Sequence, residues 1–467
     1  MGILPRHAKT DRSGRLILHP ITPEPETQEP PPTVCDVLVV GGGPAGSAIS
    51  ALLAERGWTV HLLEKDHHPR FHIGESLLPH SLPLLKRLGV LPAVEKIGLP
   101  KYGAEVVSPY HQKSRMLYFS KALDGSQPFA YQVKRAEFDK ILADNAVSKG
   151  VCFHEGVKAK HVEFRPGRTH VVHARGKTGS ALTWETKFVI DASGRDTFLS
   201  GQFGGKYRND NHNSAAIFGH FKGVKRLRGA DEGNISIVWF DHGWWWIIPF
   251  KDGTTSVGAV CWPSYIKTRK GPLDEFFRDT IATCPPVAER MAEAKPIGPT
   301  YAAANYSYRR DTMRGEGYLM VGDAFAFIDP VFSSGVHLAL NSATLGATVV
   351  DAYLREAPEY AACSREFERN VRLGVKTYSW FIYRFTQPAL RNLFMSEHSF
   401  LKMEEAVLSI LAGDAFGKSP TRFPIWLFKI AYYLVCLFNF RENWDAYRKR
   451  MTGTPVRVTE IQDYAVH

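Results

Sequence analysis

The hydrophobic positions of the chain form short apolar runs that alternate with stretches of helical spacing, a pattern typical of an α/β protein. The clearest unit lies between Val34 and Lys65. Within it, Val37 to Val40 form a β-branched run typical of a buried strand, a helix is expected from about Ala45 to Arg56, and Thr59 to Leu63 form a second apolar strand. The order strand, helix, strand predicts a βαβ unit.

Later apolar runs predict further strands. Phe188 to Ile190 and Tyr318 to Val321 are expected to be buried strands. Between about residues 214 and 262, strand patterns follow one another closely, and Lys251-Asp252-Gly253 marks a hairpin turn. We therefore expect a second sheet, which covers a pocket.

The same patterns divide the chain into three parts. Residues 1–32 are polar and end in a run rich in Pro and Glu, so they are expected to form a flexible tail. Residues 33–355 are expected to form the nucleotide-binding module, with a substrate sheet interleaved at about 95–130 and 205–300. Residues 356–467 are expected to form a helical C-terminal region, rich in aromatic side chains.

One apolar segment raises the question of a membrane. Ile425 to Phe440 is apolar except for Lys429, but it is shorter than the ~20 residues that span a bilayer. We expect a buried helix or one that docks on the surface. Peripheral membrane contact is the less favoured alternative.

Charge and cysteine usage narrow the classes of protein. The chain has 467 residues and a formal net charge of +11, which predicts either an ordinary solvated surface or a basic face for an acidic carrier protein or a membrane. The basic residues are scattered and form no nucleic-acid motif. The six cysteines contain no C-x-x-C pair, so neither a metal site nor a disulfide framework is expected. Without an apolar signal segment in the first 32 residues, the expected location is cytoplasmic.

Candidate chemistry begins at the loop between the first strand and helix, which reads G-x-G-x-x-G. Gly41 allows a tight turn, Gly43 lets the backbone approach a pyrophosphate, and Gly46 lets helix and strand pack closely. The helix N-terminus at Ala45 offers free amides to phosphate groups. Glu64, at the end of the second strand, stands where a carboxylate accepts hydrogen bonds from a ribose. The loop predicts dinucleotide binding; the alternative is an ordinary βαβ turn.

Three further motifs accompany this loop, and each is short. They are PRFHIGESLLP at residues 69–79, the pattern W-x-W-x-I-P at Trp244, Trp246, Ile248 and Pro249, and GDAFAFIDPVFSSGVH at residues 322–337. Taken alone, the tryptophan pattern is also what a strand with aromatic core residues on one face would have. Taken together, the four motifs resemble the flavin-dependent halogenases, from residue 34 to about residue 350.

This resemblance implies an α/β (α+β) fold with a Rossmann-like FAD-binding domain of the GR2 type, an antiparallel sheet inserted over the active site, and a helical C-terminal region. It also implies an oxidoreductase that uses O2 and chloride or bromide, with FAD reduced by a separate flavin reductase. Further FAD contacts would come from the following residues: Glu75, Ser76, Arg135, Asp323, Pro330 and Gly335.

The resemblance also assigns the reacting groups. Lys101 occupies the position of the family's lysine between flavin and substrate, where it would relay hypohalous acid to the aromatic ring. Ser334 and Gly335 open a helix whose amides would bind the halide. Members that act on free tryptophan carry a glutamate where this chain has Phe332, so the departure argues for an electron-rich phenol or pyrrole, free or tethered to a carrier protein.

Three other functions remain open. A flavin monooxygenase would hydroxylate its substrate and needs neither Lys101 nor a halide site. An isoprenoid reductase of the same superfamily would share the glycine loop and the Gly322-Asp323 pair, and would use Ile425 to Phe440 as a membrane dock. A flavin-binding protein without activity is the third.

Overall fold

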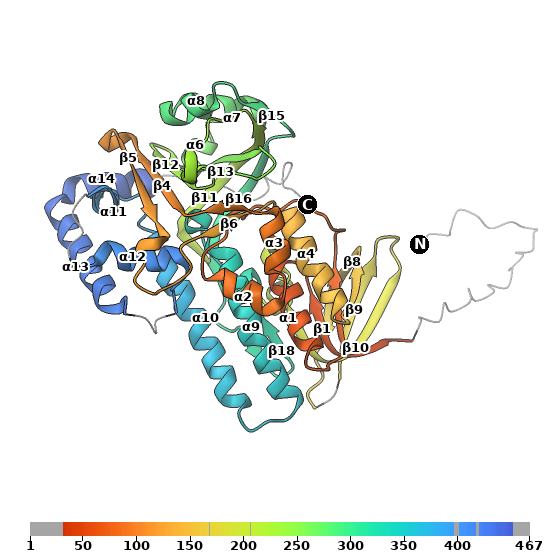
Figure 1. The fold of residues 1–467 in the computed structure, drawn as a ribbon. Helices are drawn as coiled ribbons and strands as arrows, with labels where there is room; N and C mark the ends of the chain where they lie inside the picture. The colour runs from red at the N-terminus through yellow and green to blue at the C-terminus, as the bar shows by residue number, and fades with distance from the viewer. Residues whose placement is uncertain (1–30, 168, 206, 397–400, 417–419, 452–467) are drawn as a thin grey trace, which may run out of the picture.

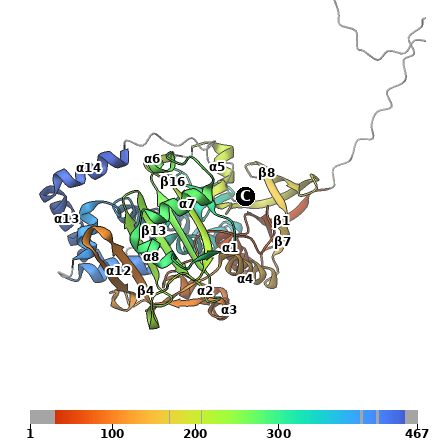
Figure 2. The same cartoon turned by 90° about the horizontal axis from the view of Figure 1, so that it is seen from above.

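The computed structural model describes residues 31–167, 169–205, 207–396, 401–416 and 420–451. The flexible tail expected for residues 1–32 therefore lies almost wholly outside the described residues. Figures 1 and 2 show two sheets, with helices packed on the first sheet and on both sides of the second.

The first sheet has eight strands, and its centre is the parallel arrangement that the βαβ pattern predicts. The central strand is β1 (Thr33–Val40), which pairs in parallel with β2 (Val60–Glu64) and β10 (Ala181–Asp191). The sheet continues with β7 (Cys152–Glu155) beside β2 and β18 (Tyr318–Met320) beside β10, both parallel. The other three, β8 (Val157–Glu163), β9 (His170–Gly176) and β17 (Arg314–Gly315), pair antiparallel with their neighbours. Since β1 is flanked on both sides and covered on both faces, its residues from Val37 are a continuous apolar run.

Helices cover this sheet and begin at its carboxyl edge. The expected first helix is confirmed as α1 (Pro44–Ala54), ending two residues earlier than predicted. It packs against α9 (Ser334–Leu354) and α4 (Arg135–Ser148). The C-terminal helix α10 (Tyr360–Ile382) in turn packs along α9 (Figure 1).

The second sheet has nine strands. Its path runs β19-β16-β11-β14-β13-β12-β4-β5, with β15 added at β11. All its pairs are antiparallel except β12 with β4, which is parallel. The strands are β4 (Gly103–Ser108), β5 (Lys113–Tyr118), β11 (Tyr207–Lys222), β12 (Ile235–Phe240), β13 (Gly243–Pro249), β14 (Thr255–Cys261), β15 (Lys295–Pro296), β16 (Tyr301–Arg309) and β19 (Ala326–Phe327). The hairpin turn expected at residues 251–253 is confirmed between β13 and β14.

Two separate apolar clusters cover the two faces of this sheet. Trp245 and Ile247 of β13 pack on one side against α7 (Leu273–Ala282) and α8 (Pro285–Met291). Trp244 and Trp246 face the other cluster, which includes side chains of the C-terminal helices. Because every residue of β13 is buried, the sheet is an internal layer of the molecule.

The remaining C-terminal helices close the outer side. They are α11 (Pro388–Met395), α12 (Met403–Ala412), α13 (Arg422–Phe438) and α14 (Phe440–Met451). Among the described residues, no single helix has the length and hydropathy to cross a bilayer, and only the pair α13–α14 passes by composition, bent by 95° at its junction.

Candidate active site

The glycine loop after β1 has room for a ligand at one position only. A Cβ on Gly41, whose φ is +106°, would lie 2.4 Å from the carbonyl oxygen of Ala192, and one on Gly46 would lie 1.8 Å from that of Gly41. At Gly43 the nearest atom is 3.7 Å away, on the Arg70 side chain. The outer glycines are therefore needed for packing, whereas Gly43 leaves the open space that a pyrophosphate requires.

The start of α1 adds unpaired backbone donors. Its N-cap is Gly43, so no side chain caps the helix, and Pro44 follows at the first position; Ala45 lies in the same turn. Amides of a first turn have no partner within the helix and carry the positive end of its dipole. The residues present at this loop therefore fit the phosphates of FAD.

Glu64 is held beside the loop rather than left free. Its Oε2 accepts hydrogen bonds from the Gly42 amide (2.9 Å) and Arg70 (3.0 Å). Burial acts to raise the pKa of Glu64, but the Arg70 charge and the backbone hydrogen bonds outweigh it and keep the pKa below its usual value. Glu64 is thus an ionised, oriented carboxylate next to the nucleotide loop.

Two pairs of charged or polar side chains, Arg135 with Asp139 and Glu75 with His220, include two of the residues expected to contact FAD. Arg135 binds Asp139 through two hydrogen bonds of 2.7 and 2.9 Å and donates a third, of 2.7 Å, to the Ile73 carbonyl oxygen. Glu75 is buried and contacts His220 at 2.9 Å. The expected flavin contact of Arg135 would therefore have to use the donors that Asp139 and Ile73 leave free.

Asp323 has a different environment. It follows β18, and burial raises its pKa to about 6 against the opposing charges of Arg195 and Arg135. Its carboxylate forms no ion pair with another described residue. A carboxylate short of hydrogen-bond donors fits a ligand that brings hydroxyl groups, as the ribityl chain of FAD does.

Lys101 is the most unusual of the candidate residues. It is 2% exposed, and its Nζ donates to Ser76 Oγ (2.8 Å) and the Leu77 carbonyl oxygen (3.1 Å). The ammonium also lies over the Phe119 ring, 5.2 Å from its centre. No carboxylate of the described residues pairs with this amine, and burial lowers the pKa of Lys101 to about 7.

The backbone around Lys101 explains how it is placed. Lys101 ends β3 (Leu99–Lys101), which pairs with β6 (Ala130–Gln132), and the loop carrying Ser76 is bonded to the other side of β6 through a bridge to Gln132. The next two amides, of Tyr102 and Gly103, both donate to Asn234 Oδ1 at 2.7 and 2.8 Å. Asn234 is a positioning residue without a local sequence signal.

Lys101 opens onto a small apolar cavity of about 30 Å³. Its walls come from β4, β5, β12, the loop before α9 and the C-terminal helices. They include Phe119, Ile235, Ile237, Phe332, Phe385 and Phe394. The sequence indicated Lys101 and Phe332, but not the aromatic and aliphatic residues from the C-terminal helices.

The segment directly before α9 borders the same cavity through Val331, Phe332 and Ser333. Pro330 and Phe332 lie in a short 3-10 helix, Ser333 has a positive φ of 55°, and α9 begins at Ser334. The expected loop is thus partly helical. Ser334 is 1% exposed and its Oγ has no hydrogen-bond partner among the described residues, while Gly335 is exposed, with no atom within 4 Å of an added Cβ. This unsatisfied hydroxyl and open backbone fit an anion.

The tryptophan motif lies behind the cavity rather than in it. The rings of Trp244 and Trp246 are 5.9 Å apart, and Trp246 Nε1 donates to Ser256 Oγ at 3.1 Å. Ile248 belongs to the same apolar cluster, and Pro249 ends the strand. None of these four side chains borders the Lys101 cavity; the neighbouring strand β12 does so instead. The motif therefore packs beside β12, the strand that lines the cavity.

A second cavity of about 60 Å³ adjoins the first and shares Leu117, Phe394 and Leu408 with it. Its other walls include Phe428 of α13 and the ion pair of Arg115 and Glu404. Both cavities are therefore bordered by residues of the C-terminal helices α11 and α12.

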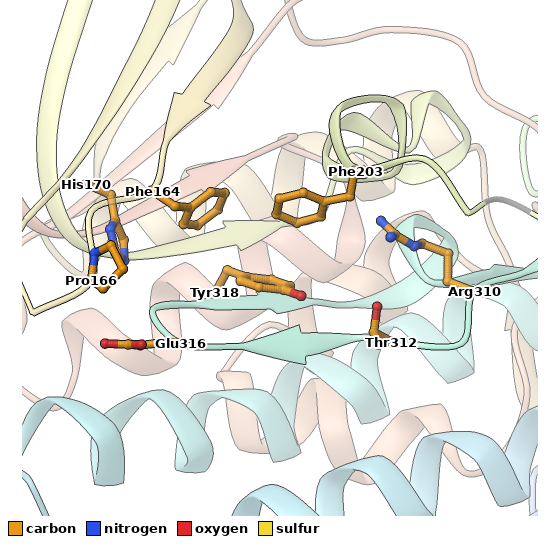
Figure 3. Close-up of a pocket in the computed structure, with 8 residues that line it drawn as sticks. All are labelled: Phe164, Pro166, His170, Phe203, Arg310, Thr312, Glu316 and Tyr318. Carbon is orange, nitrogen blue, oxygen red and sulfur yellow. The ribbon is translucent and has the colours of Figure 1, made fainter.

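A larger cavity, of about 350 Å³, lies elsewhere (Figure 3). The rings of Phe164, Phe203 and Tyr318 surround one side of it, with centres 5.2 to 5.4 Å apart, and Arg310 lies at its end. It shares no residue with the Lys101 cavity. Its size therefore does not identify it as the reaction site.

Metal chemistry has no visible basis in the described part of the chain. Within it, no three His, Cys, Asp or Glu side chains are grouped to hold a metal ion. All six cysteines are free thiols.

Comparison with known proteins decides the family. A family model for an FAD binding domain matches residues 34–368. The flavin-dependent halogenase gsfI of Penicillium aethiopicum is 33% identical over 416 residues, which cover 84% of this chain and 76% of that protein. The chain belongs to the flavin-dependent halogenase family. The family, the FAD-binding fold and the class of enzyme expected from the four motifs are thereby confirmed.

Other relatives of this halogenase differ in their substrates. A chlorinase of 1H-pyrrole-2-carbonyl peptidyl-carrier protein from Pseudomonas fluorescens is 29% identical, over 82% of this chain and 90% of that protein. A tryptophan 2-halogenase of Chondromyces crocatus is 34% identical, over 72% and 65%. The relatives therefore leave the substrate branch unresolved.

Solved structures agree on the fold of the halogenase. The myxobacterial chondrochloren halogenase CndH has a TM-score of 0.72 and 30% identity, and the match covers 92% of this chain and 99% of that one. A flavoprotein/dehydrogenase of Cytophaga hutchinsonii has a TM-score of 0.80 and 29% identity, covering 87% and 100%.

Proposed function

We propose that this halogenase transfers chlorine or bromine from hypohalous acid, held by Lys101, to an electron-rich aromatic ring. The observation that carries the proposal is the buried amine of Lys101 at an apolar cavity bordered by the segment directly before α9. FAD, reduced by a partner flavin reductase, would react with O2 and oxidise the halide. The chain's own residues would hold the halide, exclude water and deliver the oxidised halogen.

Cofactor binding would use the backbone more than side chains. The open space at Gly43 and the first turn of α1 suit the pyrophosphate, and Glu64 suits the ribose. Asp323, with its raised pKa, suits the ribityl hydroxyls, and Pro330 the ring system. Glu75 and Ser76 would border the flavin from the loop after β2, and Arg135 from the start of α4.

Halide capture is proposed for the start of α9. Ser334 brings a buried hydroxyl that lacks a partner among the described residues, and Gly335 an unobstructed backbone. Both lie in the first turn of a 21-residue helix, whose dipole favours an anion.

Lys101 is suited to hold an oxidised halogen in either protonation state. With a pKa of about 7, it is present both as ammonium, which can donate a hydrogen bond to hypohalous acid, and as free amine, which can form a haloamine at Nζ. The surrounding aromatic and aliphatic walls keep out water that would release the acid. The rate would then depend on ring orientation within the cavity.

A phenol or a pyrrole is the proposed substrate, free or attached to a carrier protein. Phe332 lies in the cavity wall, where a carboxylate base would otherwise stand, so the ring's own oxygen or nitrogen would have to activate it. The carrier-bound pyrrole in the name of one relative supports including tethered substrates. We propose a cytoplasmic, two-component enzyme because the sequence has one nucleotide fingerprint and unpaired cysteines.

Mass spectrometry of a substrate panel tests this function. Phenols, carrier-tethered pyrroles and free tryptophan would each be incubated with the protein, FAD, a flavin reductase with NADH, O2 and chloride or bromide. A halogen isotope doublet on a phenol or pyrrole supports the proposal. A doublet on tryptophan alone would contradict the substrate class, and a hydroxylated product would contradict halogen transfer.

A further inference from the structure

Helices α13 and α14 lie at the outer edge of the molecule (Figures 1 and 2), and both carry large apolar side chains that are exposed to solvent. We call this set the aromatic face: Phe423, Trp426, Ile430, Tyr433, Leu434, Leu437 and Phe438 of α13, with Phe440 and Trp444 of α14. Their exposed fractions run from 37% at Ile430 to 86% at Phe438. Scattered exposed apolar residues are normal, but a continuous patch indicates an interaction site.

The same helix is also apolar on its inner side. Ile425, Phe428 and Tyr432 are buried against the protein, so α13 is already docked through one face. A helix that is apolar all round is normally covered on every side. The aromatic face is therefore not needed for docking α13, and something outside the described residues is expected to cover it.

Three cations lie beside this face without a carboxylate partner among the described residues: Lys376, Arg384 and Lys429. Arg384 lies over Trp380 and Tyr432, 4.7 and 5.6 Å from the ring centres, and Lys429 lies 5.0 Å over Trp380. Burial lowers the pKa of Lys429, and the charges of Arg384 and Lys376 lower it further. Helix α13 itself contains no Asp or Glu. Anions from outside the described residues would therefore complement these three cations.

We propose that the aromatic face is a docking surface for an anionic membrane. Interfacial helices bury Trp, Phe and Leu at the boundary of head groups and acyl chains, while Lys and Arg contact the anionic heads. The aromatic face has this composition, and the cations lie at its margin. Leu437 and Phe438, which are the most exposed residues of the face, come directly before the 95° bend between α13 and α14, and such exposed apolar side chains suit insertion into a bilayer.

Charge disfavours a second copy of the chain as the occupant. A symmetric interface would bring two copies of the same net-positive surface together, since α13 and α14 hold six Lys or Arg residues and two Asp or Glu residues, and surfaces of like net charge repel. An anionic membrane supplies the opposite charge along the whole surface. The inference is independent of the halogenation proposal, since it uses no residue of the Lys101 cavity.

Vesicle sedimentation with the full chain and bound FAD tests the docking. The probes are phosphatidylcholine vesicles with and without about 30% phosphatidylglycerol, which supplies the anionic charge. We expect sedimentation with the anionic vesicles, weakened by salt. The double variant Trp426→Glu/Leu437→Glu should lower the partition coefficient by about tenfold or more, because two apolar contacts are lost and two like charges added.

Two controls make the test specific. Val147→Glu alters an exposed apolar residue of α4, away from the aromatic face, and should leave vesicle binding unchanged. Lys376→Glu/Lys429→Glu should reduce the preference for phosphatidylglycerol. The proposal is overturned if the wild-type protein does not sediment with anionic vesicles, or if Val147→Glu weakens binding as much as the double variant. It is also overturned if the aromatic face proves to hold a dimer, by light scattering, that does not bind vesicles.

Discussion

The nucleotide loop and the Lys101 cavity are built in opposite ways. The loop is one short stretch, Gly41–Gly46, whose shape depends on backbone conformation and the absence of Cβ atoms. The cavity collects side chains from three strands of the second sheet, the loop before α9, the turn after α10 and the helices α11 and α12. The glycine loop tolerates few substitutions of its own residues but many around it, because its shape depends on the backbone. The Lys101 cavity can be altered by a substitution at any of the side chains that line it. Cofactor binding and substrate choice can therefore change separately in this fold.

The largest effect on one site without the other is expected for Lys101→Met. This substitution keeps the length of the side chain and removes the amine. We expect loss of halogenation by about a thousandfold or more, because a group that acts directly in the reaction is absent. FAD binding should be unchanged, since the glycine loop is untouched. The variant should also be at least as stable as the wild type, because burying a charge without a counter-ion opposes folding.

Product formation by mass spectrometry, flavin absorbance and thermal unfolding measure these three effects. Lys86→Met, the same change at an exposed position of α2 (Ser81–Leu88), is the matched control. Full halogenation by Lys101→Met would remove the lysine from the mechanism and leave the cavity as a binding site only.

The next prediction concerns the loop. Gly43→Val should weaken FAD binding by more than about tenfold, because a side chain would occupy the open space proposed for the pyrophosphate. It should leave the unfolding temperature of the FAD-free protein nearly unchanged, as the atom nearest to an added Cβ, apart from the chain neighbours, is 3.7 Å away at the flexible end of Arg70. Gly46→Ala should instead prevent stable folding, since its Cβ would lie 1.8 Å from the Gly41 carbonyl oxygen.

Fluorescence titration with FAD and thermal unfolding distinguish the two glycines. Gly201→Val provides the control, because Gly201 of α5 (Phe198–Phe203) also has open space around it but lies outside the loop. Normal FAD affinity in Gly43→Val would place the pyrophosphate elsewhere.

The same contrast explains what the sequence could predict. Val37–Val40, the glycine loop and the Lys251–Gly253 turn are recognisable because local spacing determines their backbone shape. Phe394 and Leu408 could not be assigned to the cavity, since each follows helical spacing that suits any buried helix, and Phe385 lies in a turn between two helices. Nor did spacing show that α13 leaves one apolar side exposed, because periodicity identifies apolar faces and not their partners.

A third prediction uses the protonation of Lys101. Its pKa is about 7 when folded and about 10.4 in an unfolded chain, so between these pH values the unfolded state binds the extra proton. Stability must therefore rise with pH through this window, by up to about 4 kcal/mol from this group. In Lys101→Met that rise should be absent. Denaturant unfolding of both proteins from pH 7 to 10 measures the difference, and parallel curves would contradict a buried, neutral amine.

The smallest effect is expected at a single cavity wall. Phe332→Leu shortens a side chain that lies 5.4 Å, centre to centre, from the Phe385 ring and 6.4 Å from that of Phe381. It should cost about 1 to 2 kcal/mol of stability and change KM by a few-fold while leaving FAD affinity alone. Because the cavity is only about 30 Å³, added space should favour the larger members of the phenol and pyrrole panel. Steady-state kinetics across the panel measure this shift. A loss of FAD affinity as large as the change in KM would show that the cavity and the cofactor site are coupled. That result would contradict the independence expected of the two sites.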